Sequence, residues 1–482
     1  VRSINDIDNN SYSSKVFNEL LDIFSSMVPE FINDGFIRLD LIVVITTNKD
    51  GGLSLYDSYS NIMEIRFDPT YKSDEMILFK DIKSLAKVTL PPTLTTIYHN
   101  MFSNCESLAI IKIPDSVATI EYNAFYNCEN LNEIEIPDSV TIISSNAFEK
   151  CQKLTKIKLS SNLTKIESEA FKNCVSLKSI EIPSTVTEIG YGTFSECSSL
   201  FEINIPEKVT IIQHSLFENC TSLKKVTLPS ACTSIDLCAF RNCHSLNEVI
   251  LPSSAVVIGT KCFSNCKSLK SVTFSSSLAH LRSEAFSGCS SLTNVEITSH
   301  LNSIGKECFL NCTSLEKVTI ESNEFVSIKK SAFRNCLSLK EISISGSMFS
   351  IDFGAFADCT SLEEVNIPDS LKFLAGEAFL NCKTLKCFEI PEKLSTIGPK
   401  AFCGCSTLKE ISIPSFVSII GTSAFSKCSM LEKATINSKN VTFGFGIFKE
   451  CQLVEILTPY PSKINISKKI IGIDSKVSVK KI

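Results

Sequence analysis

Hydrophobic positions recur along most of the chain with a period of 23 residues. In one copy, Ile180 and Ile182 flank Glu181, which predicts a short strand with both isoleucines inward and the glutamate outward. Pro183 follows, and because proline has no amide hydrogen it ends the hydrogen-bonded ladder there. The rest of the copy turns further apolar side chains inward on a second and a third side: Val186, Ile189, Thr193, Phe194 and Cys197.

Sixteen cysteines mark successive copies of this pattern. They are spaced by 23 residues, except for one interval of 24 between Cys312 and Cys336. One copy alone cannot bury its apolar face, whereas stacked copies share a continuous core. The pattern therefore predicts a β-rich repeat solenoid of about 16 repeats of 23 residues. The cysteines are Cys105, Cys128, Cys151, Cys174, Cys197, Cys220, Cys243, Cys266, Cys289, Cys312, Cys336, Cys359, Cys382, Cys405, Cys428 and Cys451.

The periodicity divides the chain into three regions. Residues 1–58 lack the repeat; helical spacing at 15–32 and a strand-like run at 36–47 predict an N-terminal cap region of helix plus strands. A small independent domain is the alternative for this region. Residues 59–460 form the predicted solenoid. Residues 461–482 are expected to be a C-terminal cap or tail, with short strands at 464–466 and 477–479 and lysines that discourage edge pairing.

The repeat unit resembles the BspA-like (Treponema pallidum-type) class of leucine-rich repeat. The resemblance is carried by spacings such as Cys128-x-x-Leu131-x-x-Ile134-x-Ile136-Pro137-x-x-Val140-x-x-Ile143-x-x-x-Ala147-Phe148, and it covers roughly residues 82–460. It implies a curved right-handed coil with a parallel sheet on the concave face. Members of the class are commonly surface or secreted proteins of bacteria and microbial parasites that are implicated in adhesion, so the resemblance implies a similar role here.

Composition and charge exclude several classes of partner. The formal net charge is −5 and the charges are interspersed, so the basic stripe that nucleic acid requires is missing from the sequence. No apolar run approaches the roughly 20 residues that cross a bilayer, so we expect no direct membrane insertion by this segment. The sequence begins at Val1 without a signal-like apolar stretch, and we expect any signal or anchor to lie outside it.

The 22 cysteines admit two interpretations. They could form a disulfide or metal ladder, but a continuous stack offers no obvious pairing, and free cysteine packs well as a small buried residue. We expect mostly reduced core thiols, which favours a reducing compartment. Six cysteines lie off the register, and Cys387, at an outward strand position, is expected to be exposed; the others are Cys232, Cys238, Cys262, Cys308 and Cys403.

We expect no cofactor, no metal and no catalysis. Cys238, Cys243, His244, Cys262 and Cys266 could be drawn as a zinc site, but their spacings follow the repeat rather than ligand geometry. The five histidines are scattered over different copies, and no nucleophile–base constellation or phosphate-binding glycine loop accompanies them.

The outward strand positions are the first candidate binding surface. They form a mixed-charge polar face without an aromatic stripe, and repeat solenoids use such a concave side to bind proteins. A purely solubilising face is the alternative. The candidate residues are Lys156, Lys158, Glu181, Glu202, Lys225, Glu248 and Lys317.

An apolar patch is the second candidate. Phe349, Phe353 and Phe373 occupy usually polar positions in adjacent copies, and Phe416 and Phe445 do the same nearby. Clustered surface aromatics are typical of interface anchors. Irregular packing where the repeat weakens is the alternative.

The predicted function is that of a non-catalytic protein-binding or adhesion protein, cell-surface or secreted. The expected partner is a protein, with host or cell-surface proteins as candidates. The alternative is an intracellular, cytoplasmic scaffold or structural repeat protein, which the cysteine usage and the missing signal favour.

Overall fold

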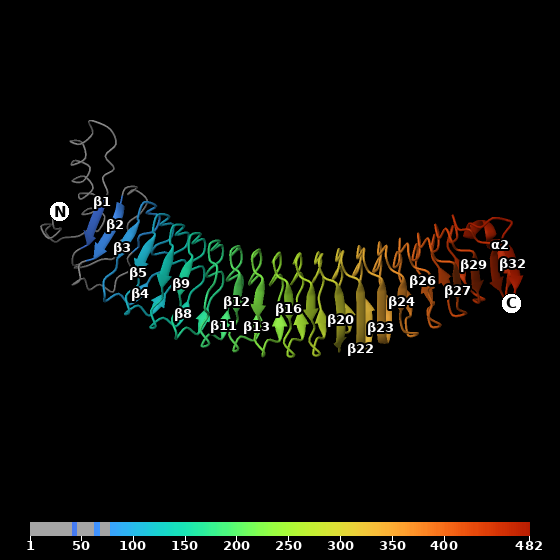
Figure 1. The fold of residues 1–482 in the computed structure, drawn as a ribbon, viewed down its shortest axis with the longest axis horizontal. Coiled ribbons are helices and arrows are strands. Elements are labelled where there is room, and N and C mark those ends of the chain that lie inside the picture. The colour runs from blue at the N-terminus through green and yellow to red at the C-terminus, as the bar shows by residue number, and fades with distance from the viewer. Residues whose placement is uncertain (1–40, 46–61, 68–77) are drawn as a thin grey trace, which may run out of the picture. The chain divides into compact units, whose positions relative to one another are not determined.

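The computed structural model describes residues 41–45, 62–67 and 78–482 of the chain. The helix expected at 15–32 lies outside the described residues. The chain divides into two units, Val1–Lys208 and Val209–Ile482. Both units are parallel β-solenoids, in which successive turns stack side by side (Figure 1), and the chain makes about 18 turns of roughly 23 residues. The predicted repeat solenoid is therefore confirmed.

The turns outnumber the sixteen marking cysteines because the first ones lack the cysteine. Phe79 and Leu85 are fully buried at the positions of the phenylalanine and leucine that flank the cysteine in later turns. Between them Ile82, 1% exposed, takes the place of the cysteine. The strand β2 (Ile62–Phe67) then adds a further parallel partner before β3 (Lys87–Thr89). A bulky apolar side chain can replace cysteine where the stack begins, so counting cysteines undercounts the turns.

In the first unit most turns contribute one strand to each of two faces, on which neighbouring strands pair in parallel. The long-strand face is built of strands of three or more residues: β1 (Leu41–Ile45), β2, β3, β5 (Ile110–Lys112), β7 (Glu133–Glu135), β9 (Lys156–Lys158) and β12 (Glu202–Asn204). The short-strand face is built of two-residue strands: β4 (Thr96–Ile97), β6 (Thr119–Ile120), β8 (Ile142–Ile143), β10 (Lys165–Ile166) and β11 (Glu188–Ile189).

The second unit repeats the two faces. Its long-strand face holds β14 (Lys225–Thr227), β16 (Glu248–Ile250), β18 (Ser271–Thr273), β20 (Asn294–Ser299), β24 (Glu364–Asn366), β27 (Glu410–Ile413), β29 (Lys433–Ile436), β31 (Glu455–Thr458) and β32 (Ser478–Lys481). Its short-strand face holds β13 (Ile211–Ile212), β15 (Ser234–Ile235), β17 (Val257–Ile258), β19 (His280–Leu281), β21 (Ser303–Ile304), β25 (Phe373–Leu374), β26 (Thr396–Ile397), β28 (Ile419–Ile420) and β30 (Thr442–Phe443).

Two strands of the second unit belong to both faces. β22 (Lys317–Ile328) and β23 (Glu341–Ile351) run around the corner without interruption and pair in parallel along their length. The corner proline found in most turns is replaced here by Glu321 and Ser345. Because these residues keep their amide hydrogens, the ladder continues where proline would end it.

Burial follows the predicted alternation along the strands. In β7 the outer glutamates are exposed while Ile134 between them is 5% exposed. The copy from which the pattern was read keeps this arrangement, with Ile180 buried and Glu181 exposed, but its residues are not hydrogen-bonded as a strand. The directions predicted for Ile180 and Glu181 are right, Ile182 is partly exposed rather than buried, and the predicted strand is wrong.

The third side of each turn, which we call the closing seam, contains the repeated Phe-x-x-Cys. In the second unit the rings of Phe240 and Phe263 lie 5.1 Å apart and nearly parallel, and the same stacking continues from turn to turn. The residue before each cysteine has a left-handed backbone, as at Asn242 with φ 60° and Asn265 with φ 60°. Asparagine tolerates this conformation better than most residues, which explains the Asn-Cys pairs of the sequence.

The carboxyl-terminal region contains a helix that the sequence did not predict. Residues 464–466, expected to be a strand, lie in α2 (Pro461–Ile471), so that expectation is wrong. Pro461 at the first helical position, Gly472 in a left-handed cap and lysines in the last turn all favour a helix here. Of the helix residues whose burial is described, Ile464 and Ile471 are buried, two helical turns apart. The strand expected at 477–479 corresponds to β32, which pairs in parallel with β31.

Candidate functional site

The outward positions of the long-strand face are exposed, as the alternation predicted. All seven charged residues singled out from the sequence are exposed: Lys156, Lys158, Glu181, Glu202, Lys225, Glu248 and Lys317. The structure does not gather them into one site. They are spread over both units, and of the seven only Lys156 and Lys158 line a cavity on the long-strand face of the first unit.

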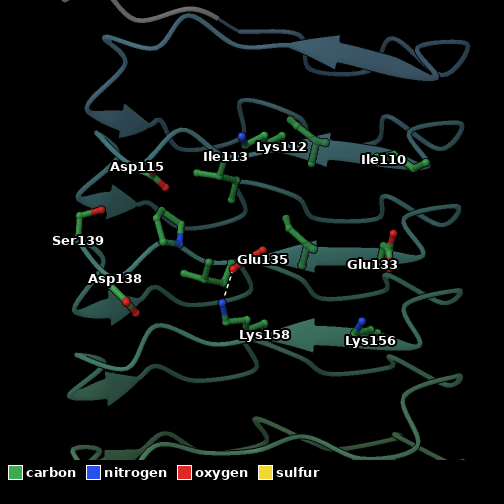
Figure 2. A pocket seen from close by; sticks show the side chains of 14 residues that line it. Ile110, Lys112, Ile113, Asp115, Glu133, Glu135, Asp138, Ser139, Lys156 and Lys158 are labelled. Carbon is green, nitrogen blue, oxygen red and sulfur yellow. Dashed lines mark hydrogen bonds and ion pairs between the residues drawn. The ribbon is translucent and has the colours of Figure 1, made fainter.

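That cavity is a shallow depression of about 750 Å³ on the long-strand face of the first unit. It lies over β5, β7 and β9, and its floor includes the edges of the inward isoleucines (Figure 2). Sequence reasoning found the lysines but missed the depression around them, which also involves Ile110, Lys112, Asp115, Glu133, Glu135, Asp138 and Ser139. Ile110 is 61% exposed, so the depression combines an apolar rim with charges of both signs.

The charges over the cavity alternate from strand to strand. β7 presents Glu133 and Glu135, and the next strand, β9, presents Lys156 and Lys158 in register with them. Figure 2 shows the ion pair between Glu135 and Lys158, which raises the pKa of the Lys158 ammonium because the carboxylate favours its charged form. Both side chains are well exposed, so water screens the pair and it adds little to stability.

The other pair of facing charges is unsatisfied. Glu133 and Lys156 are register partners, yet within the described residues neither forms an ion pair. At the corner beyond the strands, the carboxylate of Asp138 accepts bonds from the Ser161 amide at 2.8 Å and the Ser161 hydroxyl at 2.9 Å. These bonds lower the pKa of Asp138 and hold its charge in place. The depression therefore offers both free and fixed charges to an approaching polar surface.

The aromatic candidates lie in the second unit, where β22 and β23 round the corner. The rings of Phe349 and Phe373 are 5.4 Å apart and cross at 63°, so the structure brings these two together. Phe353 lies in the loop after β23 and contacts the ammonium of Lys330, 5.8 Å from the ring centre. Sequence reasoning missed Phe325 as a surface residue; it is 63% exposed in β22, because the 24-residue copy places it on the corner.

The seam cysteines are core residues with a specific partner. Each thiol donates to the carbonyl of the phenylalanine one turn earlier, as Cys266 does to Phe240 at 3.2 Å and Cys289 to Phe263 at 3.1 Å. Burial raises the pKa of Cys289 to about 12, which keeps the thiol protonated and able to donate. The prediction of buried thiols is confirmed; Cys451, at the last position of the seam, is partly exposed. The hydrogen bonds were missed, because they join each cysteine to the phenylalanine of the preceding turn rather than to the one in its own Phe-x-x-Cys.

The remaining cysteines and the histidines do not assemble into a chemical centre. Cys262 and Cys308 fill the small-residue position of the core, and Cys387 is exposed as predicted. Among the described residues no three His, Cys, Asp or Glu side chains are grouped to hold a metal ion. The imidazole of His99 lies 3.1 Å from the carboxylate of Glu121 and stacks on Tyr122. In the part of the chain that the structure describes, no helix has the length and apolarity needed to span a membrane.

The fold is that of a leucine-rich-repeat solenoid, and comparison with known proteins identifies the family. The BspA-type leucine-rich repeat region matches residues 52–160, 118–247, 233–360 and 326–455, and the chain belongs to this family. No curated protein matches the sequence significantly.

Several solved structures are similar to this chain. A leucine-rich repeat protein from Bacteroides ovatus ATCC 8483 is 26% identical, with 89% of this chain and 94% of that chain aligned at a TM-score of 0.58. A leucine rich cell surface protein from Faecalibacterium prausnitzii A2-165 is 28% identical over 66% of this chain and 83% of its own, at a TM-score of 0.38. The leucine-rich repeat protein of T. pallidum is 28% identical over 38% of this chain and 77% of its own, at a TM-score of 0.28.

Proposed function

We propose that this chain is a non-catalytic protein that binds a partner protein through the long-strand face of its first unit. The observation that carries the proposal is the depression over β5, β7 and β9, with its apolar rim and its alternating rows of glutamates and lysines. A rigid sheet holds these side chains at fixed spacing, and preorganised charges give specificity and fast association. The shallow, open form suits a protein surface better than a small molecule, which requires a deeper, more apolar pocket.

The same proposal places the protein at a cell surface or in the extracellular medium, as an adhesion or recognition molecule. The support is membership of the BspA-type family and the similarity to a protein described as a cell surface protein. An intracellular scaffold is the second candidate, favoured by the many free thiols of the seam.

The binding test exchanges the two charges of the ion pair. The double variant Glu135→Lys, Lys158→Glu keeps the net charge and the pair but reverses the pattern that a partner meets. First, a photo-crosslinking amino acid at position 110 captures the partner from the surface of target cells, and the affinity of the purified pair is then measured. We expect the exchange to weaken binding at low salt by about tenfold, and less at high salt, because surface charges act through screened attraction.

A matched control is Lys208→Glu, an exposed lysine of the same unit outside the depression. Its affinity should equal that of the unaltered protein. Equal affinity for the charge-exchanged variant, with its fold intact by circular dichroism, would rule out this face as the binding surface. Location is tested separately by labelling intact cells with an impermeant amine reagent; protection of the protein from labelling would favour the intracellular scaffold.

A further inference from the structure

The corner formed by β22, β23 and β25 departs from the repeat in a way that exposes aromatic rings. Register shifts interrupt the pairing of β22 and β23 twice, between Ser322 and Phe325 and between Val326 and Ser327. At the second shift Val326 pairs with Met348 and Ser327 with Ser350, so Phe349 is the unpaired residue of a β-bulge. The equivalent positions of other turns, such as Thr141 and Thr164, are also exposed, so Phe349 places an aromatic ring at a position that regularly faces solvent.

The exposed rings are concentrated on this corner. Phe325, Phe349 and Phe373 are 63%, 43% and 45% exposed. The register partners of Phe373 in the neighbouring strands are the polar residues Ser350 and Thr396, so the repeat itself does not require a ring at this position. We call Phe325, Phe349, Phe353 and Phe373, together with Lys330 and Lys372, the aromatic edge.

The two lysines of the aromatic edge have rings rather than carboxylates as neighbours. The ammonium of Lys372 lies 6.0 Å from the centre of the Phe349 ring, and that of Lys330 lies 5.8 Å from the centre of the Phe353 ring. Within the described residues neither lysine forms an ion pair, whereas adjacent Lys329 is 3.8 Å from Asp352. Glu324, exposed beside Phe325, is the acid nearest in sequence to the first ring. The edge therefore carries a small excess of positive charge around an apolar centre.

We propose that the aromatic edge is a second interaction surface, which binds a segment of a partner protein containing an apolar side chain flanked by carboxylates. The apolar side chain packs against the crossed rings of Phe349 and Phe373, and the carboxylates meet Lys330 and Lys372. Aromatic rings held on a rigid sheet lose little freedom on binding, which makes them effective anchors.

Charge selects this occupant over two others. A second copy of the chain in a symmetric pair would bring the same unpaired lysines toward each other, and like charges across an interface are unfavourable. An anionic membrane is normally held by clusters of about four to eight basic residues, whereas this edge has two, with Glu324 opposing them.

The test uses a displayed library of random twelve-residue peptides selected on the full chain. Counter-selection uses the double variant Phe349→Ser, Phe373→Ser, which gives these two positions polar side chains like those of the neighbouring turns. We expect the enriched peptides to share an aromatic or large aliphatic residue next to Asp or Glu. Their affinity should fall at least about tenfold in the double variant and also in Lys372→Glu, because the first removes the apolar anchor and the second repels the carboxylates.

Phe416→Ser is the matched control, since Phe416 is 63% exposed in the same unit and lies outside the aromatic edge. It should leave peptide affinity unchanged, as should the Glu135/Lys158 exchange in the first unit, so this proposal can fail independently of the proposed function. Thermal unfolding of each variant shows that the fold is kept.

Three outcomes would overturn the proposal. One is the absence of peptides that distinguish the chain from the double variant. The second is enrichment of peptides without acidic residues. The third is that the unaltered chain forms a concentration-dependent dimer in sedimentation that the double variant does not form, which would assign the edge to a second copy. Binding to phosphatidylserine vesicles that the double variant loses would likewise assign the edge to a membrane.

Discussion

Phenylalanine has two different roles within the second unit. In the closing seam Phe263 is completely buried and lies 5.1 and 5.2 Å from the rings before and after it. On the aromatic edge Phe349 is 43% exposed and has one ring neighbour, Phe373. The seam phenylalanines repeat because every turn must close in the same way. The edge phenylalanines occupy outward positions that are polar in neighbouring turns, and the stack does not need them.

The comparison shows how a repeat protein separates stability from recognition. Each turn contacts only its neighbours, so stability accumulates from the positions that recur. Outward positions have no such constraint and can differ from turn to turn. The following predictions compare matched residues of the two kinds.

The largest expected effect is that of truncating a seam ring. Phe263→Ala removes a fully buried side chain between two stacked rings and should cost about 3–5 kcal/mol of unfolding free energy, through lost burial and the cavity left behind. Phe349→Ala should change it by less than about 0.5 kcal/mol, because the ring is already largely in water. Urea unfolding, with hydrogen exchange to locate the loosened turns, measures both, and similar costs for the two variants would contradict the distinction.

A smaller effect is expected from the thiols. Cys266→Ala loses a thiol that donates to the Phe240 carbonyl and should cost about 1–2 kcal/mol, whereas Cys387→Ala, at an exposed position, should be close to neutral. The Phe240 carbonyl keeps its bond from the Cys243 amide, which limits the loss.

Thiol labelling gives the corresponding chemical test. In the native protein an aromatic disulfide reagent should modify Cys387 quickly and Cys266 slowly, since burial raises the pKa of Cys266 well above its ordinary value and blocks access. After denaturation without reductant, all 22 cysteines should react. A markedly lower count would show disulfides and contradict a reduced seam.

The smallest effect is expected at an ion pair on the long-strand face. Glu64 on β2 lies 2.8 Å from Arg66 and 3.1 Å from Lys87 on β3, and the hydrogen bonds from these cations lower its pKa from 4.5 to about 2. A carboxylate with a depressed native pKa stabilises the fold above pH 4.5, and this contribution is lost as the pH falls toward 2. Arg66→Ala should raise the pH midpoint of the Glu64 titration toward 4.5, which the NMR shift of the Glu64 carboxyl carbon measures. An unmoved midpoint would show that Arg66 does not hold the charge.

Much of the fold could be predicted because the repeat constrains it many times over. The alternation predicted Ile180 inward and Glu181 outward correctly even in a turn that forms no regular strand, although Ile182 is partly exposed. The local exceptions were harder to foresee. Ile464 and Ile466 alternate as in a strand, yet Pro461 and Gly472 delimit a helix in which Ile464 and Ile471 are buried. Two residues of alternation are too short a pattern to distinguish the two periods.

The candidate surfaces were only partly visible in the sequence. Lys156 and Lys158 could be placed on the outward face, but the depression around them depends on how Ile110 and Asp138 approach from other turns and corners. Phe349 and Phe373 could be recognised as unusual. Their contact joins two neighbouring turns, because Phe373 pairs with Ser350, the residue after Phe349, and no single strand encodes that pairing.

The sequence by itself determined the solenoid, the inward and outward positions and the buried seam, because a 23-residue period of apolar residues can be buried only by stacking the copies. The tertiary structure alone decided three further features. The strands continue around the corner at β22 and β23, the seam thiols donate to the preceding turn, and the rings of Phe349 and Phe373 meet across neighbouring turns. Each of these depends on hydrogen bonds between neighbouring turns, and a pattern read along one chain does not contain that pairing.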